Sequence, residues 1–290
     1  MPRSMAARRS KRGGSARAET ATQKPSPAPI ITLTTDFGTR DPFVGIMKGV
    51  LLSLAPAARI VDLTHAIPPQ NIAAGAHLLR SAAPWFPPGT IHIAVVDPGV
   101  GTRRRALLVE TADGYFIGPD NGLLSLAVPA RAVRQIIDVS RSRHRLKTVS
   151  GTFHGRDIFA PVAAALASGV EPARLGRAVT AMQRLRAPLV RRRGPALLGE
   201  VLWVDGFGNL TTNIARADLA PAHFQRRRLS ITIGRHLVPF RPSYARVPPG
   251  RPVALMNSSD LLEIAVNHGS AADQLDAGTG SRVRIELAVA

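Results

Sequence analysis

Five short segments of the chain combine acidic, basic, hydroxyl and histidine side chains of the kind that a catalytic site needs. They are TTDFG at 34–38, DPGVGTRR at 97–104, GPDNG at 118–122, TFHGRD at 152–157 and DGFGN at 205–209. Several of them directly follow segments with the β-branched, apolar composition of strands. Because ligands bind beyond the carboxyl ends of strands in open α/β sheets, these segments are candidates for one ligand site.

Each segment also has a structural interpretation that involves no ligand. Asp36 is a candidate helix cap or turn residue, and residues 97–99 form a typical strand-ending turn. Asn121 and Gly122 are a standard hairpin-turn pair, and a single histidine such as His154 is more often structural than catalytic. No segment taken alone therefore establishes a function.

The composition limits the chemistry and the partners of the chain. Its 290 residues include no cysteine, which excludes disulfides, thiolate zinc sites and a cysteine nucleophile and fits a reducing cytoplasm. No apolar run is long enough to predict a membrane span, so no membrane partner is expected. The net charge of +19 is typical of nucleic-acid-binding proteins, but only 4% of the residues are aromatic and no basic stretch alternates with them. We therefore expect most of this charge to be solvated.

The elements that must position the five segments alternate between strand and helix in the first part of the chain. Residues 1–29 are rich in Ala, Arg, Ser and Pro, and we expect a disordered basic tail there. The pattern predicts strands at 30–34, 59–63, 90–96, 106–110 and 115–117, and helices at 42–54, 71–83 and 158–167. This alternation predicts an α/β domain with a largely parallel sheet over residues 30–190.

The pattern changes after about residue 187, where helices become scarce. Strands are predicted at 197–204, 230–233, 237–239, 253–256 and 283–288. We therefore expect a smaller, β-rich and barrel-like domain over residues 196–290. The arginine- and proline-containing residues 188–195 are expected to join it to the first domain.

Taken in order, the polar segments closely resemble those of one enzyme family. The segments that carry the resemblance are 34–38, 95–102, 118–124, 153–157 and the pair NS at 257–258 with LEIA at 262–265. The chain is similar to the S-adenosylmethionine hydroxide adenosyltransferases, the water-using relatives of the fluorinases and chlorinases, from residue 30 to its C-terminus. The resemblance implies an N-terminal α/β domain, a C-terminal β domain and a homotrimer with the nucleoside at subunit interfaces. It also implies that water, without a cofactor or a metal ion, splits S-adenosylmethionine into adenosine and methionine.

The resemblance assigns roles to individual residues. The expected substrate-binding residues are Asp36 at the ribose hydroxyls, Phe153 near the reacting 5′ carbon, Asp205 (or a neighbour) and Ser258 at the methionine ammonium and carboxylate, and Phe207, Asn209 and Asn267 beside the adenine. Trp85 is a further candidate, together with Phe153 and Phe207, because an aromatic face attracts a sulfonium and stacks on adenine. The water-activating trio of the family falls on Asp97, Arg104 and His154.

This trio also separates the water-using branch from the halogenating one. The halogenating relatives have a Tyr-Ser pair where this chain has His154 and Gly155, and they lack the Asp and the Arg. Gly155 has no hydroxyl that could help to strip water from a halide, so we do not expect halogenation. Two departures from the fluorinase pattern remain. Residues 205–207 form a segment that is one residue shorter, and Ser259-Asp260 replaces the arginine that follows the serine there.

The chemistry expected of the trio is the activation of water, whose pKa of about 15.7 makes it a poor nucleophile. A guanidinium such as that of Arg104 stays protonated and can stabilise developing negative charge. Asp97 can orient Arg104 and accept a hydrogen bond from the water, and His154 can receive or relay a proton near neutral pH. The sequence leaves open which of the three takes the proton.

Two other functions are compatible with parts of the sequence. In a metal-dependent hydrolase, His65, His92 and His154 would join Asp36, Asp62 or Asp97 around an ion, although no closely spaced histidine pair supports this. In a nucleic-acid- or nucleoside-binding protein without catalysis, the positive charge would be the main source of binding affinity. Both stay open as alternatives to the hydrolase.

Overall fold

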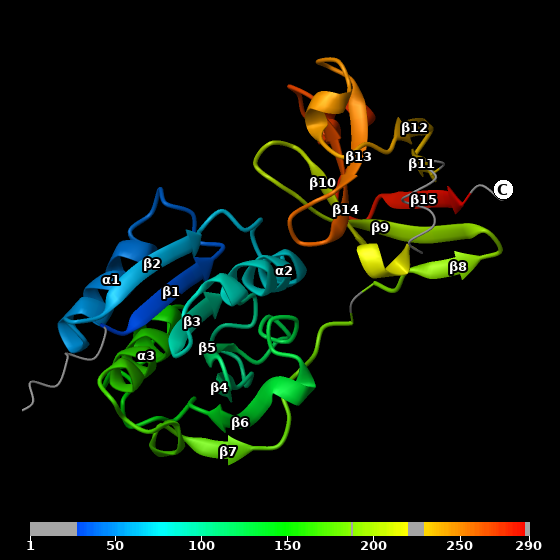
Figure 1. Ribbon diagram of the computed structural model, residues 1–290. Helices are drawn as coiled ribbons and strands as arrows, with labels where there is room; N and C mark the ends of the chain where they lie inside the picture. Colours follow the sequence, from blue (N-terminus) through cyan, green and yellow to red (C-terminus); the bar gives the residue numbers. More distant parts are fainter. Residues whose placement is uncertain (1–27, 187, 220–228, 288–290) are drawn as a thin grey trace, which may run out of the picture.

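The computed structural model describes residues 28–186, 188–219 and 229–287, which form two sheet-based domains next to each other (Figure 1). Apart from two residues, the basic tail expected at 1–29 lies outside the described residues. No helix in the described ranges is both long and apolar enough to cross a membrane.

The N-terminal domain alternates strands and helices before it continues with strands alone. Its elements are β1 (Ile30–Thr35), α1 (Phe43–Leu54), β2 (Arg59–Thr64), α2 (Ile72–Ala82), β3 (Thr90–Val95), β4 (Ala106–Thr111), β5 (Gly114–Pro119), β6 (Val133–Asp138), a π-helical turn (Gly155–Phe159), α3 (Ala160–Ala167) and β7 (Arg177–Val179). Short 3₁₀ turns lie at Ala83–Trp85, Ala130–Ala132 and Pro172–Arg174.

The sheet of this domain has seven strands in the order β2-β1-β3-β5-β4-β6-β7. The first four strands are parallel to one another, whereas β4, β6 and β7 pair antiparallel. The α/β class predicted from the sequence is therefore confirmed, and the parallel strands form one half of a mixed sheet. The carboxyl ends of β1 and β3, which carry two of the polar segments, lie side by side as expected.

Two hydrophobic cores cover the two faces of this sheet, because successive side chains of a strand point to opposite faces. Leu108 packs in the core that α1 and α3 cover, and the preceding Leu107 packs in the core beneath α2. All six residues of β3 are buried, as expected for a strand covered on both faces. The core beneath α2 also includes Trp203 and Leu261 of the second domain, so the two domains share packed surface.

The C-terminal domain is a near-closed antiparallel barrel. Its elements are β8 (Arg191–Arg193), β9 (Ala196–Val204), β10 (Leu210–Ala215), β11 (Leu229–Ile233), β12 (His236–Pro239), β13 (Pro252–Met256), β14 (Leu261–Val266), α5 (Ala271–Leu275) and β15 (Arg282–Leu287), with 3₁₀ turns at Arg216–Asp218 and Tyr244–Arg246. The strand order is β12-β11-β15-β9-β10-β14-β13, and a bridge between Phe240 and Ala254 joins the two ends of this path. The predicted β-rich, barrel-like architecture is thereby confirmed. One detail differs: Arg191–Arg193, expected in the connecting stretch, is a strand that pairs with β9.

Candidate active site

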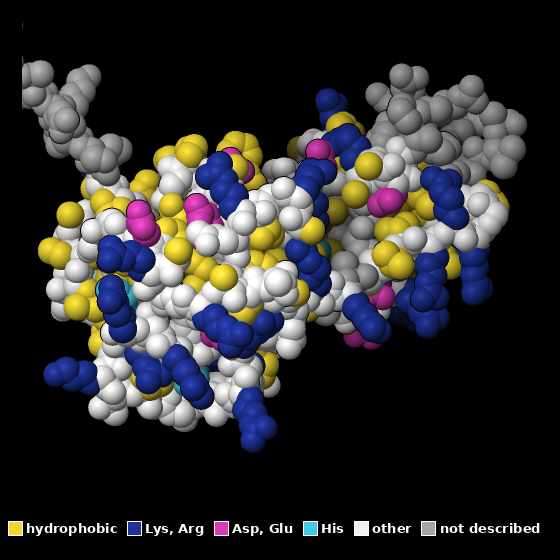
Figure 2. All heavy atoms as spheres, turned by 90° about the horizontal axis from the view of Figure 1, so that it is seen from below, with side chains coloured by type: hydrophobic (Ala, Val, Ile, Leu, Met, Phe, Trp, Pro, Cys, Tyr) yellow, Lys and Arg dark blue, Asp and Glu magenta, His cyan; other side chains and the backbone are white. Residues whose placement is uncertain are grey.

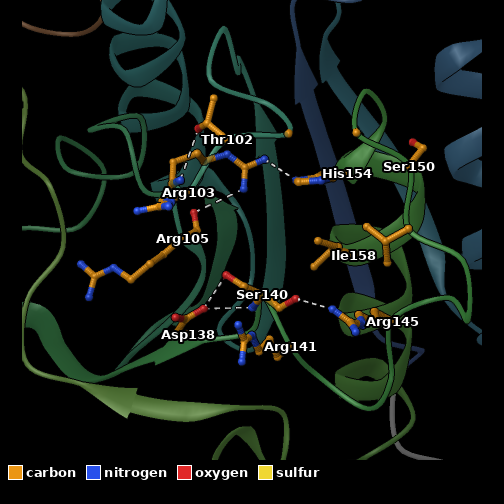
Figure 3. Close-up of a pocket in the computed structure, with 14 residues that line it drawn as sticks. Thr102, Arg103, Arg105, Asp138, Ser140, Arg141, Arg145, Ser150, His154 and Ile158 are labelled. Carbon is orange, nitrogen blue, oxygen red and sulfur yellow. Dashed lines mark hydrogen bonds between the residues drawn. The ribbon is translucent and has the colours of Figure 1, made fainter.

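Asp97, Arg104 and His154 form one continuous hydrogen-bonded group. Nε of Arg104 donates to the two carboxylate oxygens of Asp97 at 3.0 and 2.9 Å. Nη2 of the same guanidinium donates to Asp97 and lies 2.7 Å from Nδ1 of His154, the contact drawn as a dashed line in Figure 3. The side chains of Arg104 and Asp97 are only 8% and 4% exposed. The structure thus brings His154 against two residues that lie 50 or more positions earlier in the sequence.

This geometry determines the protonation of His154. Arginine remains protonated and can only donate, so Nδ1 of His154 must accept from Arg104. The neutral imidazole then carries its proton on Nε2. Burial and the charge of Arg104 lower the pKa of His154 below 6.5, although the charges of Asp97 and Asp157 act in the opposite direction. His154 is therefore held in its neutral form.

The loop that carries Asp97 and Arg104 touches the loop that carries His154 through a pair of glycines. Gly101 has a φ of +77°, a conformation that favours glycine, and a Cβ there would lie 2.2 Å from the carbonyl oxygen of Gly151. Within the loop, Thr102 donates both its backbone N–H and its hydroxyl to the carbonyl of Gly99. Only a loop without a side chain at position 101 brings the two parts of the trio this close.

A buried carboxylate fixes the segment around His154. Asp157 is fully buried, and its oxygens accept from the backbone N–H of Ser150 at 2.8 Å and from Nε of Arg156 at 2.6 Å. Burial alone would raise the pKa of Asp157, but these hydrogen bonds outweigh it and lower the pKa below 3.8. The π-helical turn begins directly after His154, and such turns are frequent at functional sites.

A pocket of about 440 Å³ opens beside the trio at the carboxyl ends of β1 and β3. Asp36, Asp97, Phe153 and His154 all line it, so it contains most of the residues expected from the first domain. One carboxylate oxygen of Asp36 accepts from the backbone N–H of Gln70 at 2.8 Å. That contact orients the carboxylate and leaves its second oxygen available to a ligand.

Three aromatic rings form one wall of this pocket. Phe37, Phe43 and Phe153 pack edge to face, with centroid separations of 5.9, 5.9 and 5.4 Å. The sequence indicated a role for Phe153 but not for Phe43 or for Phe37, which lies within the TTDFG segment. The sequence contains no signal for Gln70 either. The backbone of Gln70 has a positive φ of 63°, and its N–H donates to Asp36. The pocket therefore combines apolar rings with the carboxylates of Asp36 and Asp97.

The remaining expected residues do not line this pocket. Asp205, Phe207, Asn209, Ser258 and Asn267 belong to the C-terminal domain. Asp205 accepts from the backbone N–H groups of Phe207 and Asn209 at 2.8 and 2.9 Å, which shapes the 205–209 turn. Phe207 is 82% exposed, and the side-chain amide of Asn267 donates to a backbone carbonyl. Within one chain, this group is separate from the trio.

Trp85 and Ser258 also lie outside the pocket that contains Asp36. Trp85 projects from its 3₁₀ turn and is 82% exposed. Ser258 is exposed and lines a different cavity of about 230 Å³, together with Arg80 of α2. Two aromatic side chains with this exposure, Trp85 and Phe207, are unusual surface features in a chain with a well-packed core.

A polar group next to Asp205 was not found from the sequence. The hydroxyl of Tyr244 donates to Glu263 at 2.6 Å, and the amide of Asn257 donates to the other oxygen of Glu263 at 3.2 Å. Burial, Glu263 and the charge of Asp205 raise the pKa of Tyr244. Glu263 and Asn257 could have been found from the sequence, because they lie in segments that carry the family resemblance. Tyr244 lies outside these segments, so the sequence contains no signal for it.

The histidines considered for a metal site have other partners. Nδ1 of His65 and Nδ1 of His92 lie 2.8 Å from the hydroxyls of Thr35 and Thr32. Burial lowers the pKa of His92 to about 4. Among the residues that the structure describes, no three His, Asp or Glu side chains are arranged to hold a metal ion.

Comparisons with known proteins identify the family to which both domains are similar. Residues 31–176 match the SAM hydroxide adenosyltransferase N-terminal domain, and residues 199–284 match the corresponding C-terminal domain. An (R)-S-adenosyl-L-methionine hydrolase of Thermus thermophilus is 42% identical, over 86% of this chain and 96% of its own length. A fluorinase of an Actinoplanes species is 30% identical, over 82% of this chain and 91% of its own. The crystal structure of an uncharacterized conserved protein from Thermotoga maritima superposes with a TM-score of 0.80 at 34% identity, covering 88% of this chain and 99% of that one.

Proposed function

Because this chain belongs to the SAM hydroxide adenosyltransferase family, we propose that it hydrolyses (R)-S-adenosyl-L-methionine to adenosine and L-methionine. The observation that carries the proposal is the hydrogen-bonded trio of Asp97, Arg104 and His154 at a pocket that also contains Asp36 and Phe153. The pocket combines a carboxylate for ribose hydroxyls with an aromatic wall for a cation.

The reaction is an in-line displacement in which one bond forms and one breaks. The oxygen of water bonds to the 5′ carbon while the bond from that carbon to sulfur breaks, and the electron pair of this bond stays on sulfur. The sulfonium becomes the neutral thioether of methionine, and the water loses one proton. A cationic sulfonium is favoured next to the carboxylate of Asp97 and the rings of Phe37, Phe43 and Phe153, which all line the pocket.

Asp97 is the member of the trio that can accept the proton of the attacking water. Arg104 has no acceptor, and His154 uses Nδ1 as an acceptor toward Arg104 and carries a proton on Nε2. Oδ2 of Asp97 accepts from both Nε and Nη2 of Arg104, whereas Oδ1 accepts from Nε alone and retains a lone pair for the proton of the water. Asp97 therefore acts as the general base, Arg104 holds it in place, and His154 holds Arg104.

A homotrimer completes the site in this proposal. The residues expected at the methionine and the adenine, among them Asp205 and Asn209, lie on the C-terminal domain and outside the pocket of their own chain. A neighbouring subunit supplies them when its barrel covers the pocket. The exposed rings of Trp85 and Phe207 support such a contact, because a neighbouring subunit would bury their apolar surface away from water.

The test of the reaction is to incubate the purified protein with (R)-S-adenosyl-L-methionine in water labelled with oxygen-18, with and without chloride. We expect adenosine labelled at its 5′ hydroxyl, together with unlabelled methionine, at a rate that chloride does not change. A 5′-chlorinated nucleoside would show that the His154-Gly155 pair does not prevent halogenation. Absence of any product would refute the hydrolase.

The shared site has its own test. Asp97→Asn and Asn209→Ala disable opposite halves of the site, and subunits of the two inactive variants are exchanged by mild denaturation and refolding together. In a ring of three, about one quarter of the sites then combine two intact halves, so activity reappears. If the activity of the refolded mixture is no greater than the summed activities of the two variants, each chain forms its site alone.

A further inference from the structure

A second cavity, of about 500 Å³, lies beside the trio and shares His154 with the substrate pocket (Figure 3). Three segments form it: residues 101–105 before β4, residues 138–145 after β6, and residues 149–158 around the π-helical turn. Asp36 and the aromatic wall line only the first pocket. The reaction proposed above therefore uses one side of the trio and leaves this second side without a role.

Arginines dominate the lining of this cavity. They are Arg103, Arg104, Arg105, Arg141 and Arg145, and the one carboxylate among the lining residues is that of Asp138. Seen from below Figure 1, the N-terminal domain presents far more Lys and Arg than Asp and Glu side chains (Figure 2). The lining residues of the cavity thus carry a net positive charge, as does the face of the N-terminal domain seen in Figure 2.

Several of these charges lack a counterion. Arg104 pairs with Asp97 and Arg105 with Asp120, which neutralises both. Arg103 and Arg141, in contrast, form neither an ion pair nor a hydrogen bond with any other residue that the structure describes. Among the described residues, the guanidinium of Arg145 donates only to the carbonyl of Ser140, at 3.0 Å.

Asp138 compensates only part of this charge. One of its oxygens accepts from the backbone N–H and the hydroxyl of Ser140, at 2.9 and 2.6 Å, and it pairs with none of the lining arginines. Three unneutralised guanidinium groups, those of Arg103, Arg141 and Arg145, therefore face a single carboxylate.

Polar side chains from two of the three segments lie around the same space in this cavity. Figure 3 shows Arg141 and Arg145 on the side of Ser140, with His154 and Ser150 on other sides of the same space. The hydroxyl of Ser150 accepts a backbone N–H from Phe153 and hydrogen-bonds the carboxylate of Asp157, so it is held at the edge of this space. Planar guanidinium groups match the paired oxygens of phosphate and carboxylate, and phosphate adds a second negative charge.

We propose that this cavity binds a small dianionic oxyanion of the phosphate class, and that occupancy slows the reaction through Arg104 and His154. The volume exceeds that of inorganic phosphate, so a phosphomonoester enters as well. An anion beside Arg104 competes with Asp97 for the guanidinium, and the carboxylate is then held less firmly. Because the substrate occupies the other pocket, the anion lowers kcat and leaves KM unchanged.

The binding test uses the full-length protein and needs no substrate. Inorganic phosphate is titrated by calorimetry at constant ionic strength, with sodium chloride as the balancing salt. We expect saturable binding that Arg141→Gln and Arg145→Gln each weaken about tenfold, since each removes a charged donor. Arg235→Gln, at the exposed turn between β11 and β12, removes the same charge elsewhere and should leave binding unchanged.

Two further measurements identify the ligand and test whether its binding changes turnover. Glycerol 3-phosphate that binds more tightly than inorganic phosphate would identify a phosphomonoester, whereas weaker binding would identify the free ion. The kcat for S-adenosylmethionine should fall to a plateau at the phosphate concentration that saturates the calorimetric signal. Binding that is absent, or equally strong in the Arg141 and Arg145 variants, would overturn the proposal, as would displacement of phosphate by duplex DNA. Since the calorimetry involves no turnover, its failure is distinct from failure of the hydrolase assignment.

Discussion

Nη2 of Arg104 lies 2.7 Å from Nδ1 of His154, and this contact decides what each member of the trio can do. Arg104 must be the donor, so the imidazole accepts on Nδ1 and carries its proton on Nε2. His154 is thereby an acceptor that holds Arg104, and Arg104 in turn holds Asp97 on the wall of the substrate pocket.

Asp97→Asn should reduce turnover more than His154→Gln does. The amide can no longer take a proton, and loss of a general base typically costs about 10²–10⁴-fold in rate. His154→Gln keeps a carbonyl oxygen that can accept from Arg104, so it should lose less. The kcat of both variants is measured under saturating substrate. If His154→Gln were the more damaging change, the imidazole and not the carboxylate would be the base.

Arg104→Ala should lower kcat by about 10²–10³-fold, the usual cost of losing a positioned charged donor at a reacting centre, with little effect on KM. Arg104→Lys should rescue little of the rate, because one ammonium cannot donate to both oxygens of Asp97 in the way that the guanidinium does. The control is Arg235→Ala, an exposed arginine of the barrel. Unchanged turnover in Arg104→Ala would remove the trio from the mechanism.

His154 should titrate below pH 6.5 when its imidazole signals are followed by NMR. Burial and the charge of Arg104 lower its pKa, while Asp97 and Asp157 oppose the shift. A lowered pKa in the folded protein favours the neutral form, so the stability that it contributes is complete above pH 6.5. That stability is lost as the pH falls through the folded-state pKa.

The same titration in Arg104→Gln tests the cause of the shift. Removal of the neighbouring charge should move the midpoint of His154 upward, because Asp97 and Asp157 then face the imidazole without opposition from Arg104. A midpoint at or above 6.5 in the unaltered protein would contradict the hydrogen-bond pattern inferred for the trio.

Gly101→Ala should separate the two loops that carry the trio. The new Cβ would meet the carbonyl oxygen of Gly151, and the positive φ alone costs about 1–2 kcal/mol for a residue with a side chain. We expect a lower midpoint in thermal unfolding together with a reduced kcat. Gly99→Ala is the matched change in the same loop, where the nearest atom lies at 3.5 Å, and it should lose much less stability. Equal losses in the two variants would show that the contact with Gly151 is unimportant.

The sequence predicted the α/β and β-barrel classes and the three segments that meet beside the pocket, because strand ends and short polar motifs are local signals. It did not predict that Asp36 is oriented by Gln70, since a positive φ depends on how the loop packs. It could not show that Asp205 and its neighbours lie away from the trio, because a short polar motif does not reveal which surface of the folded chain it occupies. The second cavity was also hidden, since Arg141 and Arg145 follow no motif and gather only where three loops converge.

The arrangement of strands has a consequence for how this protein avoids uncontrolled aggregation. A strand with a free edge can add a strand from another chain, and charged residues on that edge oppose such growth. In the barrel, the bridge between Phe240 and Ala254 joins the two end strands. Among the described strands, those with a partner on one side only are β2, β7 and β8, of which β7 and β8 have three residues each. All three residues of β8 are exposed arginines, so their positive charge protects a vulnerable edge by electrostatic repulsion.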